Sequence, residues 1–453
     1  MKKHFIRLSV LGTLIILCIW QTTLLWLGDT SSHHFLGNTT SEVVTQPREI
    51  WVNNNGLAYK IDGDNDESRL GLISELSNEI RKGNYQLTQE DKYTYTQLLS
   101  RQGFVYEYGT SLSIEEIFGT SINKEGNKKE LDQVAGLFVD ISEGDKYRSS
   151  IYLIDEQQQV IQKLVLEARL ELHNRTIEHY NDETKIEGIK TYQASLLHME
   201  YSKAFLQNVF YPLNNHNMPI AYKSLKWQPM ITGETREEEA AQLEAYVNTF
   251  FKNPLYKEWT VTDNGIVFND SLNMNVRYSD VGVMEFKKLI TGEVVKLSPL
   301  ERLNKVSTFI DTSPAIPQQL KKGLYLKEVI PDNEVGESIY RFGYRYEGFE
   351  VLLTETAKEE LQIDEFLELA VKSNEVVRGS WLMLDLVEQE GEHYGQLAKE
   401  GKVAIEEVRQ LCQISSLERT PLGYLECAYR IDSIEEPLGF DWAALYEGEW
   451  YFP

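Results

Sequence analysis

A run of apolar residues near the start of the chain, residues 8–27, most constrains what this sequence can fold into. It reads LSVLGTLIILCIWQTTLLWL and contains no charged residue. At 1.5 Å per helical residue, about 20 residues span the roughly 30 Å hydrocarbon core of a bilayer. We therefore expect one transmembrane helix over 8–27, because no second uncharged run of that length follows it.

The charges on either side of this run predict its orientation. Lys2, Lys3 and Arg7 precede it, and the first charged residue after it is Asp29. Because basic residues favour the cytoplasmic side, residues 1–7 are expected to be a cytoplasmic tail and the bulk of the chain to be extracytoplasmic. A cleaved signal peptide is the alternative. Against it, the run exceeds the roughly 7 to 15 apolar residues of a signal-peptide core, and no A-x-A-like cleavage site follows.

Small and polar residues inside the run predict a contact with partner helices in the membrane. Such residues let two helices approach closely and form hydrogen bonds. The alternative is that the polar end of the run marks the membrane surface, where tryptophans act as anchors. The candidate partner-contact residues are Ser9, Gly12, Thr13, Trp20, Gln21 and Thr23.

The rest of the chain is strongly acidic. The formal charge of the whole sequence is −25, although Lys2, Lys3 and Arg7 contribute +3 at its start. Such a surface repels nucleic acid, anionic lipid headgroups and acidic wall polymers, so we expect neutral, basic or protein partners and no nucleic acid. Cys412 and Cys427 lie in the extracytoplasmic part, where they could form a disulfide. The alternative is that Cys412, on the apolar side of a predicted helix, is a buried thiol that packs as a small hydrophobic residue.

Residue patterns beyond position 48 predict an α+β fold with mostly antiparallel sheets. The roughly 425 residues after the anchor are enough for two to four domains. Residues 50–52 and 57–61 flank an Asn-Asn-Asn-Gly turn, which indicates a hairpin. A helical stripe at Leu72, Ile73, Leu76 and Ile80 follows, and strands are expected at 135–141, 150–154 and 160–166.

The second and third blocks each have a helix followed by short strands. Thr235 and Glu238 form a predicted capping box for a helix that ends at Asn253-Pro254, and a meander over 259–286 follows. In the third block, residues 338–346 alternate and turn at Glu347-Gly348 into 349–353, which predicts a hairpin. The other expected elements there are helices at 303–310, 363–371 and 403–412 and strands at 380–387, 423–431 and 442–446.

These patterns predict three folded domains after the anchor. Because the second and third blocks share a helix-then-meander order, our hypothesis is that they are diverged copies of one unit. The expected ranges are a cytoplasmic tail at 1–7, a transmembrane helix at 8–27, a juxtamembrane linker at 28–48, and α+β domains at 49–195, 196–300 and 301–453.

No motif in the sequence supports an enzyme. Asp62 to Glu67 looks like a metal loop, but an EF-hand starting at Asp62 needs Gly sixth and Glu twelfth, where Glu67 and Ile73 stand. The histidines lack zinc-site spacing, and there is no P-loop, G-x-S-x-G or G-x-G-x-x-G. We therefore predict no catalytic, cofactor or metal residues. The alternatives are an anchored cell-wall glycan hydrolase, with two of the 70 carboxylates across a cleft, or a wall-binding module.

One passage is more specific than these patterns. It consists of YVNTFFKNP at 246–254, Trp259, IVFND at 266–270 and MEF at 284–286. A helix that ends in a double Phe, followed by a short polar step and aromatic strands, resembles the central signature of the YycH family, also called WalH. The single N-terminal apolar run and the aromatic tail at 450–452 are also similar to that family.

This resemblance implies a non-enzymatic regulator that needs no cofactor. Members of the family are anchored outside the membrane of Gram-positive bacteria. They pair with a YycI-type single-pass sister protein and act through their membrane helices on the sensor histidine kinase WalK, in the two-component system that controls cell-wall homeostasis. The implied fold is three α+β ectodomain domains, of which the last two are alike.

Overall fold

The computed structural model describes most of the chain after residue 45. The described residues are 46–61, 66–88, 95–120, 133–141, 148–155, 160–181, 191–194, 210–212, 220–270, 273–290, 295–331, 336–389, 395–397, 399, 401–413, 424–446 and 449–453. The apolar run at 8–27, with all six candidate contact residues, and most of the Asp62 string lie outside them. Within the described part, no helix is both long and apolar enough to cross a membrane.

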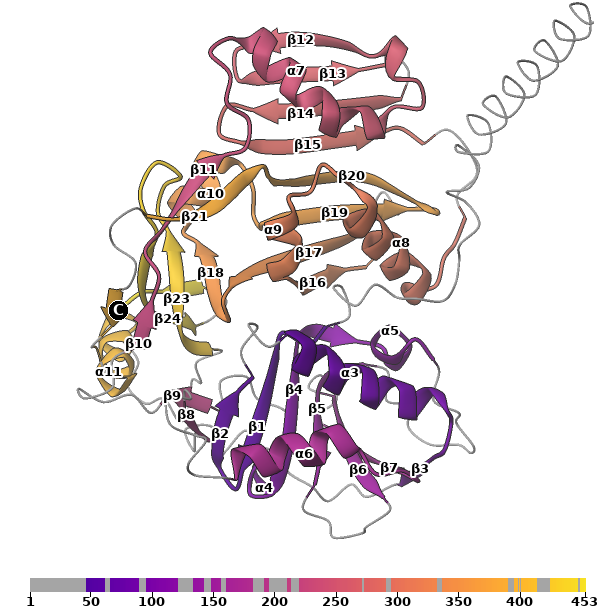
Figure 1. Cartoon of the computed structure of the whole chain (residues 1–453), viewed down its shortest axis with the longest axis vertical. Coiled ribbons are helices and arrows are strands. Elements are labelled where there is room, and N and C mark those ends of the chain that lie inside the picture. The colour runs from indigo at the N-terminus through magenta and orange to yellow at the C-terminus, as the bar shows by residue number, and fades with distance from the viewer. Residues whose placement is uncertain are drawn as a thin grey trace, which may run out of the picture. The chain divides into compact units, whose positions relative to one another are not determined.

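The first described sheet follows the order β3-β7-β6-β5-β4-β1-β2-β8-β9, and its neighbouring strands are antiparallel. Its strands are β1 Glu49–Asn54, β2 Leu57–Lys60, β3 Tyr85–Thr88, β4 Gln102–Leu112, β5 Val134–Asp140, β6 Ser149–Asp155, β7 Val160–Leu166, β8 Thr191–Ala194 and β9 Phe210–Pro212. Helices α3 Asp66–Arg81, α5 Ile114–Phe118 and α6 Glu171–Tyr180 pack on one face, and α4 Tyr95–Leu99 packs on the other (Figure 1).

The expected elements of this part are confirmed. Strands β1 and β2 form the predicted hairpin, in which Asn55 and Gly56 adopt the positive φ values that a tight turn requires. Leu72, Leu76 and Ile80 of α3 are buried against the sheet, as the helical stripe predicts. The runs at 135–141, 150–154 and 160–166 are strands β5, β6 and β7.

A second large sheet contains most of the later strands. Its order is β12-β13-β14-β15-β20-β19-β17-β18-β23-β24-β25, with β16 also paired to β17, and β18 and β23 are parallel where the other pairs are antiparallel. Its strands are β12 Glu258–Thr262, β13 Gly265–Asn269, β14 Met274–Ser279, β15 Val283–Lys288, β16 Leu324–Ile330, β17 Ser338–Tyr346, β18 Phe349–Leu353, β19 Leu367–Lys372, β20 Glu375–Leu382, β23 Tyr424–Ile431, β24 Gly439–Tyr446 and β25 Glu449–Tyr451. The sheet is thus continuous across residue 300, and the domain ranges given above stay a prediction.

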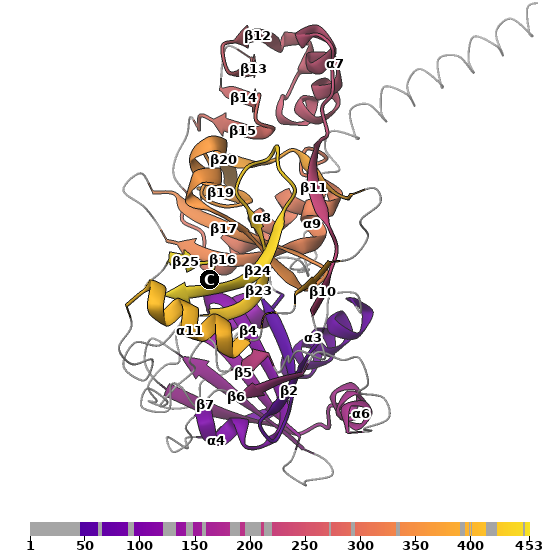
Figure 2. The same ribbon diagram turned by 90° about the vertical axis from the view of Figure 1, so that its left-hand side faces the viewer.

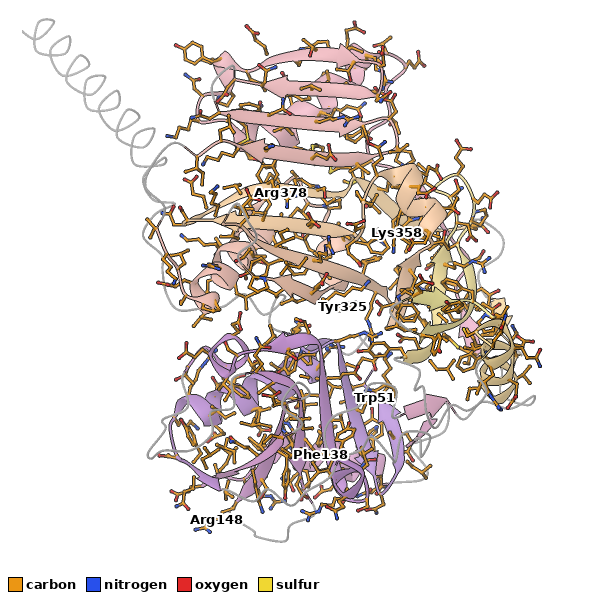
Figure 3. All side chains as sticks on the ribbon, turned by 180° about the vertical axis from the view of Figure 1, so that it is seen from behind. Trp51, Phe138, Arg148, Tyr325, Lys358 and Arg378 are labelled. Atoms are coloured by element: carbon orange, nitrogen blue, oxygen red, sulfur yellow. The ribbon has the colours of Figure 1, made fainter. Side chains whose placement is uncertain are left out.

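Helices and two small ribbons complete the described part. The helices are α7 Arg236–Val247, η5 Asn248–Phe250, η6 Pro254–Tyr256, α8 Pro299–Thr312, α9 Gln318–Gly323, α10 Glu355–Leu361 and α11 Gly401–Leu411. The ribbons pair β10 Ile220–Tyr222 with β22 Gly395–Leu397 and β11 Leu225–Pro229 with β21 Leu384–Glu388. Helix α7 lies across one face of the β12–β15 strands (Figure 2). Side chains fill the space between sheets and helices (Figure 3).

An aromatic cluster joins η5, α8 and the second sheet. Phe250 lies 5.0 Å from Phe286 and 6.2 Å from Trp381, measured between ring centroids, and Phe309 lies 5.3 Å from Phe286. Trp381 is fully buried and donates its indole N–H to the Ala315 carbonyl at 2.8 Å. The double-Phe helix end therefore serves as a packing element, because aromatic pairs bury large areas in defined geometries.

Three expectations need correction. The segment expected as a helix at 363–371 forms strand β19 from Leu367, which pairs with both β17 and β20. The prediction was wrong because the apolar residues of this buried strand also satisfy helical spacing. The strand expected at 380–387 is interrupted at Met383, where β20 ends and β21 begins. Helix α7 ends at Val247, continues as a 3₁₀ turn to Phe250 and leaves Phe251 extended.

Two local predictions have mixed outcomes. Thr235 caps α7 by accepting the Glu238 N–H, but the Glu238 carboxylate accepts from the backbone N–H of Glu234, so the capping box is incomplete. No disulfide joins Cys412 to Cys427. Cys427 is buried and Cys412 is half-buried.

Candidate functional site

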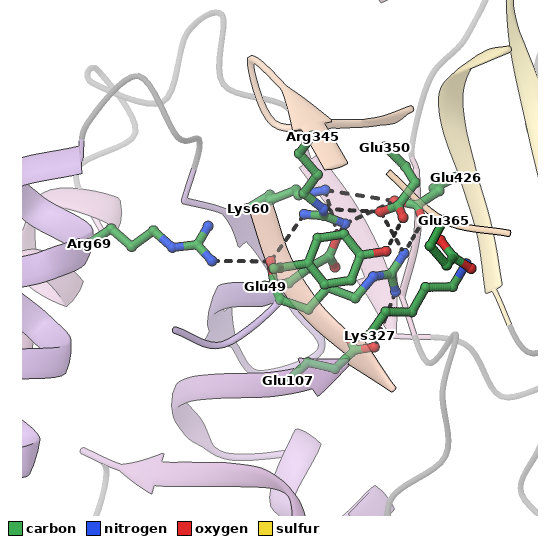
Figure 4. Close-up of polar contacts among 11 residues, drawn as sticks. Glu49, Lys60, Arg69, Glu107, Lys327, Arg345, Glu350, Glu365 and Glu426 are labelled. Carbon is green, nitrogen blue, oxygen red and sulfur yellow. Dashed lines mark hydrogen bonds and ion pairs between the residues drawn. The ribbon is translucent and has the colours of Figure 1, made fainter. Parts of the chain in front are cut away.

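The most unusual chemistry in the described part is a set of buried charges where the two large sheets meet (Figure 4). Fully buried charged side chains are rare unless they are paired. Here cations and carboxylates from both sheets converge on one another. The members are Arg48, Glu49, Lys60 and Glu107 from the first sheet and its leading residue, and Arg345, Glu350 and Glu426 from the second. We call these seven residues the charge cluster.

Strand register brings the carboxylates of the first sheet together. Glu49 at the start of β1 stands directly opposite Glu107 of β4 in the antiparallel ladder. Like charges in that position repel, so the pair needs cations beside it. Arg48 supplies one, with Nη1 at 3.5 Å from Glu107, and Lys60 of β2 supplies another, with Nζ at 2.6 Å from Glu49.

The second sheet builds its half of the cluster from a tight hairpin. Glu347 and Gly348 turn β17 into β18 with positive φ at both residues, which places Arg345 opposite Glu350. The Arg345 Nε donates to Glu350 at 3.1 Å. Glu426 of β23 joins them, because β23 runs parallel beside β18.

Two arginines tie the halves together. Arg48 Nη2 lies 3.3 Å from Glu350 and also contacts Glu426, although it belongs to the segment that leads into the first sheet. In the opposite direction, Arg345 of the second sheet contacts Glu49 and donates to the Arg48 carbonyl at 3.2 Å. Removal of either arginine would therefore take one cation away from carboxylates of both sheets.

Two tyrosine rings enclose the Arg48 guanidinium. Its carbon lies 3.8 Å from the centroid of the Tyr424 ring and 5.7 Å from that of Tyr325, both within cation–π range. Tyr325 also donates its hydroxyl to Glu350. Gly343 leaves room for this ring, because a Cβ there would lie 2.4 Å from the Tyr325 hydroxyl.

The environment sets the charge of each carboxyl. Burial acts to raise the pKa of each of the four carboxyl groups. Lys60 and Arg345 nevertheless hold the pKa of Glu49 well below its usual range. Arg48 and Arg345 likewise lower the pKa of Glu350 against its burial. Burial and the neighbouring Glu49 raise the pKa of Glu107 to about 7, despite Arg48.

The cluster thus has three cations and four carboxyl groups, and one proton makes it neutral. Burial raises the pKa of Glu426 as well, whereas those of Glu49 and Glu350 are lowered. We assign the proton to Glu107, because its pKa is raised to about 7 and Arg48 is its one cationic partner among the described residues. The arrangement can hold the two sheets in one relative position. Its net charge changes when Glu107 gains or loses a proton near neutral pH.

A pocket of about 400 Å³ opens beside the cluster. Its walls come from the chain before β1, from α3, from the α9–β16 corner and from the β17–β18 hairpin. Its charged lining residues are Arg48, Arg69, Lys322, Arg345 and Glu347. Glu347 is paired with Lys223, so this pocket does not contain the pair of unpaired carboxyls that a glycan hydrolase needs.

A second buried polar group lies within the first sheet. The His173 Nε2 is 2.6 Å from the Tyr106 hydroxyl and its Nδ1 is 2.7 Å from Glu75. Because Glu75 can only accept when ionised, Nδ1 carries the proton and Nε2 accepts from Tyr106. Burial lowers the pKa of His173, although Glu75 opposes this effect. His173 and Tyr106 are both buried, so the group fastens α6 to α3 and β4.

Among the described residues, no group of three or more His, Cys, Asp or Glu side chains is arranged to hold a metal ion. The predicted partner-contact residues, Ser9 to Thr23, lie outside the described part. The charge cluster was not predicted from the sequence. A signal was present in Glu107, an isolated charge within the apolar strand 104–108.

Comparison with known proteins bears on the fold. No family model matches the sequence, and no curated protein matches it. The crystal structure of YycH from Bacillus subtilis matches with a TM-score of 0.56 and 12% sequence identity, over 91% of this chain and 97% of that one. The chain has a YycH-like fold. The resemblance seen in the sequence is thereby confirmed for the fold.

An uncharacterized protein from Eubacterium rectale also matches, with a TM-score of 0.31 and 10% identity, over 51% of this chain and 80% of that one. That score is too low to indicate a shared fold. The YycH match agrees with the mixed α/β architecture and mostly antiparallel sheets described above.

Proposed function

We propose that this chain is a membrane-anchored extracytoplasmic regulator of a sensor histidine kinase, in a two-component system for cell-wall homeostasis. The YycH-like fold over 91% of the chain carries the proposal. The apolar run at 8–27, with basic residues before it, supports one membrane helix with the N-terminus in the cytoplasm. The chain acts by protein contact and is not an enzyme.

The partners are a WalK-type kinase and a YycI-type single-pass sister protein. The membrane helix contacts them through the face that bears Ser9, Thr13 and Thr23, because small and hydroxylated residues let helices pack closely. The ectodomain alters how strongly the membrane helix contacts its partners. The charge cluster suits this role, since it joins two sheets through a small number of paired charges, and a change in those pairs would change how the sheets are held together.

Affinity purification from the native membrane tests this proposal. The full-length protein is compared with a version that lacks residues 1–27 and with two single variants, Thr13→Leu and Thr22→Leu. Thr22 is the matched control, because at 3.6 residues per turn it falls on the other side of the helix from Thr13. We expect the full-length chain and Thr22→Leu to recover a histidine kinase and a second single-pass protein, and the other two to lose both.

Two results would contradict the proposal. Equal recovery of the kinase by the shortened and full-length proteins would exclude contact through the anchor. Recovery of neither partner, together with release of sugars from purified cell wall by the full-length protein, would favour the glycan hydrolase instead.

A further inference from the structure

The open edge of the second sheet is an unusual surface. Strand β12 ends the sheet order, so among the described residues it pairs with β13 on one side only, and no described strand pairs with its other side. All five of its residues are exposed. The β12–β13 register is continuous, and β12 contains no lysine or proline. Natural sheets commonly protect an edge with a bulge, a lysine or a proline, and this edge has none of these.

Apolar side chains gather at the same edge. Trp259 stands opposite Phe268, and Val261 stands opposite Ile266, so all four share the sheet face that α7 covers. Phe268 and Ile266 are fully buried, but Trp259 is 37% and Val261 49% exposed. The apolar side of β12 is therefore only partly covered, in contrast to that of β13.

The turn before β12 extends this apolar strip. Leu255 is 90% and Tyr256 73% exposed, and both lie in the 3₁₀ turn η6. Lys257 links this turn to α7, because its Nζ lies 3.1 Å from Glu244 of α7. The same Nζ lies 5.3 Å from the centre of the Phe268 ring. The turn is thereby held against the helix, so the strip is part of an ordered surface. We call Leu255, Tyr256 and β12 the open edge.

Charge indicates what can bind there. Glu258 begins β12 and Asp263 follows it, and neither forms an ion pair with a described residue. Between Glu234 and Lys288 the sequence has ten acidic and six basic residues. A basic partner complements this surface, whereas a second copy of a chain with a charge of −25 would bring like charges together.

We propose that the open edge binds an extended segment of another protein, which adds to the second sheet beside β12. The segment has apolar side chains at alternate positions, to cover Trp259 and Val261, and lysine or arginine at its ends, to meet Glu258 and Asp263. Backbone hydrogen bonds supply affinity in strand addition, and alternate side chains supply specificity. The inference rests on the proposed function in taking protein contact as the way the chain acts.

A synthetic peptide tests the proposal on the purified full-length protein. The probe is a fluorescein-labelled peptide, Lys-Lys-Val-Thr-Val-Thr-Val-Lys-Lys, and its binding is followed by fluorescence anisotropy. Two matched peptides carry glutamate in place of the lysines or N-methyl groups on alternate amides. The protein variants are Val261→Lys and the control Val295→Lys, because Val295 is an equally exposed valine at 52%.

We expect the lysine peptide to bind and to slow hydrogen exchange in β12. The glutamate peptide should bind about tenfold more weakly or worse at low salt, and the N-methylated peptide should not bind. Val261→Lys should weaken binding by about tenfold or more, since it places a like charge against the peptide, and Val295→Lys should leave binding unchanged.

Several results would overturn the proposal. They are absence of binding by the lysine peptide, equal binding by Val261→Lys, or slowed exchange away from β12. If hydrogen exchange in β12 slows as the protein concentration is raised without peptide, the edge binds a second copy of the chain. Slowed exchange with phosphatidylcholine vesicles alone would assign it to a lipid surface. The peptide assay measures binding at β12 alone, and the affinity purification measures contact through the anchor. Failure of this proposal and failure of the proposed function are therefore distinguishable.

Discussion

Replacing Glu107 with glutamine should stabilise the protein at alkaline pH and have little effect at pH 5. The pKa of Glu107 is raised from its ordinary value of 4.5 to about 7 in the folded state, mainly by burial and by Glu49. The folded state therefore holds this proton more tightly than the unfolded state does. Stability from this group is fully present below pH 4.5 and is lost as the pH rises to about 7.

The magnitude follows from the size of the shift. One pKa unit corresponds to about 1.4 kcal/mol, so ionisation of Glu107 costs the folded state about 3 kcal/mol at pH 8. Glutamine keeps the shape of the neutral carboxyl and cannot ionise. Changes in other groups, such as the lowered pKa of His173, are common to both proteins and cancel in the comparison.

The assay is thermal unfolding of the full-length protein, followed by tryptophan fluorescence at pH 5, 6, 7 and 8. For a unit of about 150 to 250 residues, 1 kcal/mol shifts the midpoint by roughly 2 to 4 °C. Glu107→Gln should therefore raise the midpoint at pH 8 by several degrees and leave it nearly unchanged at pH 5.

Glu350→Gln is the matched control with the opposite sign. Arg48 and Arg345 lower the pKa of Glu350, so its ionised form stabilises the fold. Its loss breaks a buried pair, which typically costs about 3 to 5 kcal/mol. If Glu107→Gln also lowered the pH 8 midpoint, or if its effect were the same at every pH, the assignment of the proton to Glu107 would be refuted.

Two further substitutions test packing beside and below the cluster, each by the same thermal assay. Gly343→Ala should destabilise by about 1 to 3 kcal/mol, because its Cβ would lie 2.4 Å from the Tyr325 hydroxyl. Gly439→Ala is its control, since the nearest atom there is 3.7 Å away, and equal midpoints for the two would contradict the packing argument. Tyr106→Phe should cost about 1 to 3 kcal/mol, because it leaves the buried His173 Nε2 without a donor; an unchanged midpoint would show that this bond contributes nothing.

Local patterns in the sequence were sufficient for much of the fold. The β1–β2 and β17–β18 hairpins follow from turn residues that accept positive φ, flanked by alternating apolar residues. The α3 stripe follows from its helical spacing. The same reasoning failed for β19, where an apolar run buried between two strands has spacing that a helix also satisfies.

The charge cluster could not be predicted in the same way, because its contacts are not local. Arg48 and Glu426 are 378 positions apart, and their meeting depends on how two sheets pack. One part of the cluster was accessible to local reasoning. Arg345 and Glu350 flank a two-residue turn, so the predicted hairpin already placed them opposite each other.

The open edge and the second-sheet half of the charge cluster belong to one hydrogen-bonded sheet. From β12, the ladder passes through β13, β14, β15, β20, β19 and β17 to β18, which carries Glu350. Packed sheets resist local deformation, so a displacement at one strand is passed to its neighbours. A segment added beside β12 would therefore act on the same structural element that supplies Arg345 and Glu350 to the junction with the first sheet. If the chain acts by contact as proposed, this arrangement physically connects the proposed binding edge to a buried carboxyl whose pKa is raised to about 7.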